Sequence, residues 1–136
     1  MDGEDISTDQ PKPRWFIDLG WYQQNNRAIS ALAKGSLCDK CRMQLSTEGK
    51  EISEAKLLAN IRDCCSHAPE FINGQLPILE SAFRFFLANG NRPLTLEELG
   101  LQLSERLGGD TYRTSEKILS SLLKSDQYYG LQPTPS

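Results

Sequence analysis

The chain has 136 residues, of which 38% are hydrophobic and 24% are charged, and its net charge is −3. This length allows one domain or two small lobes. The acidic balance argues against a protein that binds nucleic acid over its whole surface, because such binding depends on clustered Lys and Arg. No apolar run approaches the ~18 residues that span a bilayer, and no signal-peptide pattern is visible, so we expect a cytoplasmic protein without membrane contact.

The first residues of the chain differ sharply from those that follow. Residues 1–13 are polar and acidic and are predicted to be a disordered tail, as are residues 133–136 at the other end. A dense aromatic cluster then runs from Trp15 to Tyr22. Such a cluster usually packs onto a core, although one or two of its members could face a partner protein. Residues 23–34 have the composition of a helix, and Gly35 is a suitable end for it.

The next segment is predicted to hold one loop and one helix. Residues 42–52 are polar and include Gly49, which favours a loop or a short ribbon. Ser53 is a good N-cap for a helix that extends to about Cys65. From Arg27 to Arg62 there are seven Lys or Arg against four Asp or Glu, so this part of the chain is mildly basic.

Cys38, Cys41, Cys64 and His67 form the pattern C-x2-C, 22 intervening residues, then C-x2-H. Three cysteines and one histidine with paired spacing are typical ligands of a structural zinc ion. In a reducing compartment such a set favours a metal over disulfides. We therefore predict a structural Zn²⁺ site with these four ligands. Lys40 and Arg42 would offset the negative charge of the thiolates.

The choice of ligands has one alternative, because Cys65 could replace Cys64. We prefer Cys64, since the two-residue gap before His67 lets both side chains reach one ion, and Cys65 would then be a small buried hydrophobe. If the only histidine binds metal, it cannot serve as a general base. A catalytic zinc also needs an open coordination position, so we expect no enzyme; a thiol or zinc enzyme is the remote alternative.

The second half of the chain has a sharper helical pattern. A broad apolar face begins after Pro77 and ends at Asn89-Gly90. Thr95 and Glu98 form a capping box for a second helix. A third helix begins near Thr114 or Ser115, and residues 128–132 alternate weakly like one strand.

The phrase Asn-Arg-Pro-Leu-Thr-Leu-Glu-Glu-Leu (91–99), set between three short helices and a trailing strand, resembles a winged-helix domain of the HARE-HTH type. The resemblance covers about residues 76–132. It implies that the third helix enters the major groove of DNA, with Arg113, Lys117 and Lys124 as contacts. The wing of that family is normally a hairpin of two strands, and this chain has one candidate strand. Many winged helices bind proteins instead of DNA.

These observations predict a mainly α protein with a zinc-stabilised N-terminal helical lobe (14–74) and a winged-helix-like lobe (75–132) that has little β structure. The expected function is non-enzymatic binding of nucleic acid in transcription. The alternative is a protein–protein adaptor with a structural zinc. No small-molecule substrate is expected.

Overall fold

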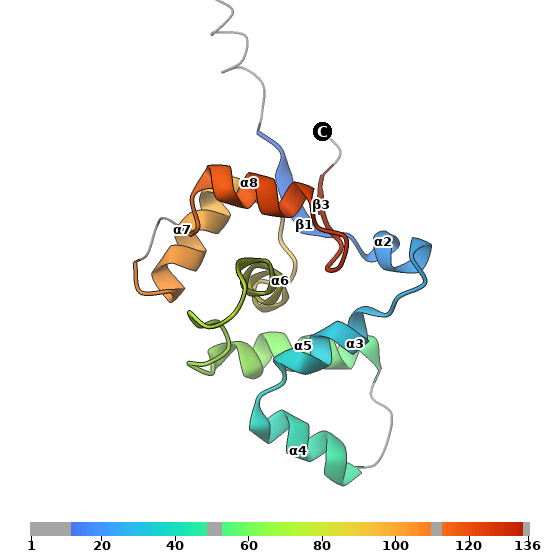
Figure 1. The fold of residues 1–136 in the computed structure, drawn as a ribbon. Helices are drawn as coiled ribbons and strands as arrows, with labels where there is room; N and C mark the ends of the chain where they lie inside the picture. The colour runs from blue at the N-terminus through green and yellow to red at the C-terminus, as the bar shows by residue number, and fades with distance from the viewer. Residues whose placement is uncertain (1–11, 49–52, 110–112, 135–136) are drawn as a thin grey trace, which may run out of the picture.

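The structure is a computed structural model that describes residues 12–48, 53–109 and 113–134. Over these ranges the chain is mainly α-helical with one small sheet, which confirms the predicted fold class (Figure 1). The helices are α2 (Leu19–Gln24), α3 (Ile29–Ala33), α4 (Asp39–Glu48), α5 (Glu54–Asp63), α6 (Ile78–Ala88), α7 (Leu96–Arg106) and α8 (Glu116–Lys124), with 3-10 turns η1 (Lys34–Ser36) and η2 (Cys65–His67). The strands are β1 (Arg14–Ile17), β2 (Leu94–Thr95) and β3 (Leu131–Pro133).

Helix α6 lies at the centre of the molecule. Figure 1 shows it end-on, with α7 and α8 on one side and α3 and α5 on the other, while α4 projects furthest from the sheet. Seven of its eleven residues are buried, including Phe83 and Phe86. The buried residues of both halves of the chain form one hydrophobic cluster, to which Ile61 on α5 and Leu119 on α8 both belong. The predicted lobes therefore share a core.

The sheet joins three distant parts of the chain. Its strand order is β2-β1-β3, and both pairings are antiparallel. Arg14 lies opposite Thr95, and Phe16 lies opposite Gln132. Strand β1 is thus the centre of a sheet whose other members belong to the second half. The predicted division at residue 74 groups β1 with the first half, whereas its strand partners lie in the second.

The predicted strand at 128–132 is observed slightly later, at Leu131–Pro133, so Pro133 lies in β3 rather than in a tail. The neighbour of β3 in the sheet is β1. Of the predicted N-terminal tail, residues 1–11 lie outside the described ranges.

Local signals in the second half are confirmed. Thr95 and Glu98 form the predicted capping box on α7. Ser115 caps α8 through its side chain, which accepts a hydrogen bond from the backbone N–H of Ile118. Helix α7 packs closely against the start of α8, since a Cβ added at Gly100 would collide with the carbonyl oxygen of Thr114.

Two expectations for the first half are wrong. The helix predicted over 23–34 is two short helices, α2 and α3, separated by a segment in which Asn26 has a φ of 58°. A helix cannot continue through that left-handed backbone conformation. Residues 42–52 are predicted to form a loop or a short ribbon, but α4 extends to Glu48, and residues 49–52 lie outside the described ranges. This helix has few apolar residues, so the periodicity that identifies most helices is weak in it.

Candidate metal centre and binding surface

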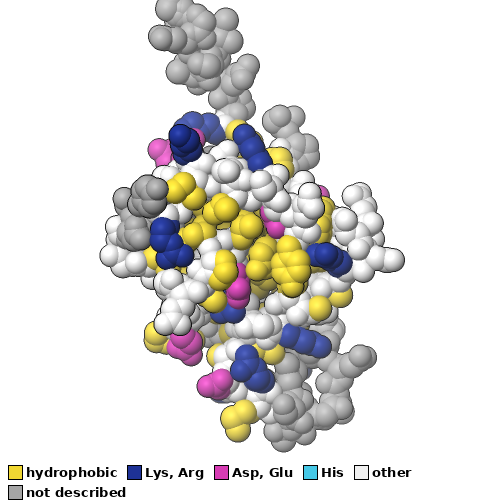
Figure 2. All heavy atoms as spheres, viewed as in Figure 1, with side chains coloured by type: hydrophobic (Ala, Val, Ile, Leu, Met, Phe, Trp, Pro, Cys, Tyr) yellow, Lys and Arg dark blue, Asp and Glu magenta, His cyan; other side chains and the backbone are white. Residues whose placement is uncertain are grey.

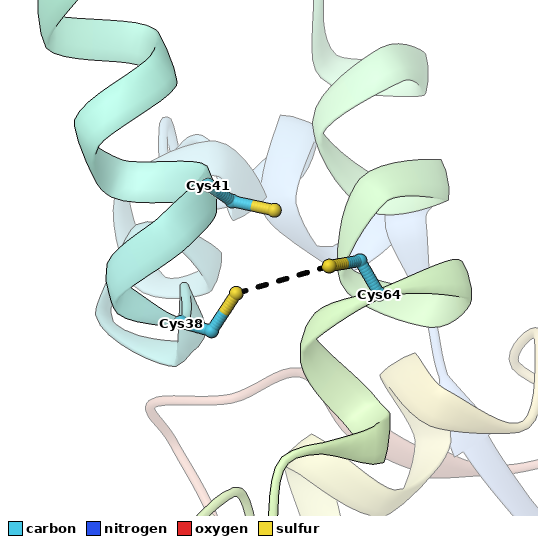
Figure 3. Close-up of side chains that lie close together, drawn as sticks. All are labelled: Cys38, Cys41 and Cys64. Carbon is cyan, nitrogen blue, oxygen red and sulfur yellow. Dashed lines mark hydrogen bonds between the residues drawn. The ribbon is translucent and has the colours of Figure 1, made fainter.

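Four cysteines meet between the start of α4 and the end of α5. Cys38 directly precedes α4, and its carbonyl accepts a hydrogen bond from the N–H of Arg42. Cys41 lies in the first turn of the same helix, whereas Cys64 directly follows α5. Figure 3 shows Cys38 and Cys41 pointing from α4 toward Cys64. The three sulfur atoms lie within 4.8 Å of one another.

Cys65 lies beside this group. Its side chain is completely buried, and its sulfur lies 3.4 Å from the sulfur of Cys38. The sulfur of Cys65 also accepts a hydrogen bond of 3.2 Å from the backbone N–H of Cys38. All four cysteines are free thiols, so the cluster contains no disulfide.

The spacing of the sulfur atoms suits a metal ion. Four ligands at a Zn–S distance of 2.3 Å on a tetrahedron lie about 3.8 Å apart. The observed separations are 3.9 Å between Cys38 and Cys64 and 3.4 Å between Cys38 and Cys65. Both separations are close to this value, although Cys65 does not belong to the group of three sulfurs that all lie within 4.8 Å of one another. The cluster is compatible with a bound metal ion.

His67 does not join the cysteines. The structure brings together three of the four predicted ligands, while His67 is exposed at the end of η2 and lies outside the group of three sulfurs. In a 3-10 helix, residues three apart share one side. Cys64 is the N-cap of that turn and its carbonyl accepts a hydrogen bond from the N–H of His67, but its φ and ψ of −123° and −63° are not those of a 3-10 helix, so the two side chains do not share one side.

The protein environment distinguishes the four thiols. A hydrogen bond from the backbone of Cys41 lowers the pKa of Cys38 to about 7, with smaller contributions from the other three thiols. Cys38 also stands at the N-terminus of α4, where partial positive charge favours a thiolate. Burial raises the pKa of Cys41 and of Cys65. Cys38 therefore becomes anionic more readily than Cys41 or Cys65.

Asp39 and Arg42 line a groove together with Cys38 and Cys65. Arg42 donates a hydrogen bond of 3.0 Å to the carbonyl of Leu37 and lies 3.5 Å from the carboxylate of Asp39. Lys40, the second cation predicted to balance the thiolates, is exposed to solvent.

The three residues predicted to contact nucleic acid have different surroundings. Arg113 is half-buried and donates hydrogen bonds of 3.3 Å to the carbonyls of both Gly74 and Leu76. It therefore ties the start of α8 to the segment before α6. Lys117 and Lys124 are exposed on α8. Figure 2 shows Lys and Arg side chains at the end of the molecule where α8 lies and also along the rest of the same face.

Lys117, Ser121 and Lys124 form one stripe along α8. All three are exposed, and their spacing of four and then three residues places them on the same helix face. Glu116, which precedes Lys117 in the sequence, forms an ion pair with Lys12, with 3.7 Å between its carboxylate and the ammonium group. The stripe is thus polar and carries two positive charges.

Comparison of the chain with protein-family models, with curated proteins and with solved structures found no match. Within the described ranges, no helix combines the length and apolarity needed to cross a lipid bilayer.

Proposed function

We propose that this chain is a non-enzymatic binding protein whose helix α8 contacts nucleic acid in a transcription-related process. The observation that supports it is the exposed stripe of Lys117, Ser121 and Lys124. Two ammonium groups separated by two helical turns can contact phosphates, and the hydroxyl between them can donate to a phosphate or a base edge. Arg113 is assigned a positioning role, since its donors are directed to backbone carbonyls.

The order of elements supports the same proposal. A helix, a short strand, two further helices and a closing strand follow one another from α6 to β3, which is the order of a winged-helix domain. The third place in the sheet is taken by β1. The close contact between Gly100 and Thr114 resembles the tight packing of a helix-turn-helix pair.

The metal proposed for the cysteine cluster is a structural Zn²⁺, bound by Cys38, Cys41, Cys64 and Cys65. Four sulfur ligands would complete a tetrahedral coordination shell and leave no position for a substrate. The ion would join the start of α4 to the end of α5. It would thereby fix the first half of the chain against the shared core.

A titration of duplex DNA followed by fluorescence anisotropy at low salt tests the proposed function. The double variant Lys117→Gln/Lys124→Gln should weaken binding, and the slope of log K against log salt should fall by about 1.8, since each phosphate contact contributes ~0.9. The matched control is Lys34→Gln/Lys56→Gln, which removes the same charge from exposed positions outside α8. Equal losses in both variants, or no binding by the native chain, would contradict the proposal.

A protein–protein adaptor is the second candidate function. Figure 2 shows hydrophobic side chains gathered on the face where α6 is seen end-on. Leu101 on α7 is a further large apolar side chain that is exposed, with 62% of its surface accessible. A protein partner bound through such surfaces would remain bound at high salt, whereas nucleic acid would dissociate.

A further inference from the structure

An apolar pocket lies between the two halves of the chain. Its volume is about 350 Å³, and its walls come from β1, α2, α3, α5 and α6. The apolar lining includes Ile17, Leu19, Leu58 and Leu87. Pockets of roughly 300–1,000 Å³ with an apolar lining and few polar groups are typical of small-molecule sites. The volume therefore suits a small ligand rather than a protein segment.

Two polar side chains border the pocket, Arg62 and Asn91. The amide of Asn91 is already engaged, since it both accepts from and donates to the backbone of Ile17. Arg62 is half-exposed, and two of its nitrogens contact the carboxylate of the neighbouring Asp63 at 2.9 and 3.3 Å. Exposed pairs of this kind contribute little stability, so the guanidinium can exchange Asp63 for another anion.

The surroundings of Arg62 are positively charged. Arg62 also borders a second groove, of about 630 Å³, together with Arg14 and Arg92. The acidic side chain in that groove, Glu98, is held by the capping box with Thr95. Three arginines, from β1, α5 and the loop after α6, therefore line this groove, and Arg62 is shared with the apolar pocket. This arrangement favours an anion beside Arg62.

We propose that the pocket binds a small amphipathic carboxylate or sulfonate. The apolar body of the ligand lies against Leu58 and Leu87, and its anionic group contacts Arg62. Leu19, which is 46% exposed, would be covered by the bound ligand. Because the walls come from both halves of the chain, the ligand would also strengthen their association. This site is separate from α8 and does not depend on the proposed function.

Two fluorescent probes with the same aromatic rings test the charge requirement. These are 8-anilino-1-naphthalenesulfonate and the uncharged N-phenyl-1-naphthylamine, each titrated into the full chain. We expect one site for each probe. Arg62→Gln should weaken sulfonate binding about tenfold, which corresponds to the loss of one hydrogen bond to a charged group, and should leave the uncharged probe unaffected. Asp63→Asn should strengthen sulfonate binding because it releases Arg62.

The location of the site is tested by filling it. Ala59 lines the pocket from α5, and Ala59→Leu should abolish binding of both probes. Lys34→Gln, which removes an exposed charge that does not line the pocket, should change neither. Unchanged sulfonate binding in Arg62→Gln, or an equal loss of both probes in that variant, would overturn the proposal. If Ala59→Leu does not fold, the opposite effects expected for Arg62→Gln and Asp63→Asn still decide the question.

Discussion

The side chain of Asn91 forms two hydrogen bonds with the backbone of Ile17, as a neighbouring strand would do. Its Oδ1 accepts a hydrogen bond of 2.8 Å from the N–H of Ile17, and its Nδ2 donates one of 2.9 Å to the carbonyl of the same residue. Leu131 of β3 lies opposite Ile17 on the other side of β1. Asn91 therefore anchors the last residue of β1 to the loop that follows α6.

Removing this amide should destabilise the chain. Asn91 has a φ of 62°, a conformation that glycine and asparagine tolerate better than alanine. Asn91→Gly loses two hydrogen bonds at ~1 kcal/mol each, so the free energy of unfolding should fall by about 2 kcal/mol. Asn91→Ala should lose about 1 kcal/mol more, because it also strains the backbone. Urea denaturation of both variants measures the difference.

Asn26 provides the control for that comparison. It shares the positive φ, at 58°, but is exposed, and no hydrogen bond of its side chain to the described residues is present. Asn26→Gly should change stability by less than about 0.5 kcal/mol. An equal effect of glycine at both positions would show that the contact with Ile17 contributes nothing.

Gly100 is required by the close packing of α7 on the start of α8. An added Cβ would collide with the carbonyl oxygen of Thr114, which is a backbone atom and cannot turn away. Gly100→Ala should therefore lower the free energy of unfolding by about 1–3 kcal/mol, even though alanine favours helix by about 1 kcal/mol. Gly35→Ala is the control, since nothing lies within 4 Å of its added Cβ. A thermal melt in which Gly100→Ala is as stable as the native chain would contradict this packing argument.

Two substitutions distinguish Cys65 from His67 as the fourth ligand of the proposed metal ion. Cys65→Ser should reduce the zinc content of the purified chain and lower its Tm, because a sulfur ligand is lost. His67→Ala should leave both unchanged, since His67 is exposed, whereas the sulfur of Cys65 lies 3.4 Å from the sulfur of Cys38. Zinc released by a thiol reagent and counted with a colorimetric chelator gives the stoichiometry. If His67→Ala lowered the zinc content and the Tm while Cys65→Ser left both unchanged, His67 would be the fourth ligand.

Local signals were predicted from the sequence more successfully than long-range contacts. The caps at Thr95 and Ser115 were found because each depends on residues three positions apart. The role of β1 was missed, because Arg14 pairs with Thr95, which lies far along the chain in the second half. Such pairings depend on register and packing, which leave little trace in a four-residue strand.

The same distinction applies to the metal centre. The C-x2-C spacing of Cys38 and Cys41 predicts that both belong to the cluster, and the structure places Cys64 with them. The position of Cys65 depends on the change from α5 to a 3-10 turn, where side-chain directions rotate. The sequence offers Cys65 only as a replacement for Cys64, because a set of four ligands that includes His67 has no place for both cysteines.

Asp126 organises the turn that leads into β3. Its carboxylate is buried and accepts three backbone hydrogen bonds, of 2.9 Å from Tyr128, 3.0 Å from Tyr129 and 3.0 Å from Leu131. Removal of a buried acceptor leaves its donors unsatisfied, at about 1–3 kcal/mol each. Asp126→Ala should therefore lower the free energy of unfolding by at least about 3 kcal/mol, and Asp126→Asn, which keeps one acceptor oxygen, by less.

The effect of Asp126→Ala should reach β1, because β3 is one of the two neighbours of that strand. Trp15 on β1 is only 4% exposed, so loss of the β3 register should shift its fluorescence to longer wavelength before the helices unfold. Trp21 also emits, and Trp21→Phe provides a background in which Trp15 is the single tryptophan. Asp63→Asn is the charge-matched control for Asp126→Asn, since Asp63 is exposed. If the helical circular dichroism and the Trp15 emission changed together at every urea concentration, β3 would be an integral part of one cooperative unit rather than a separately ordered edge.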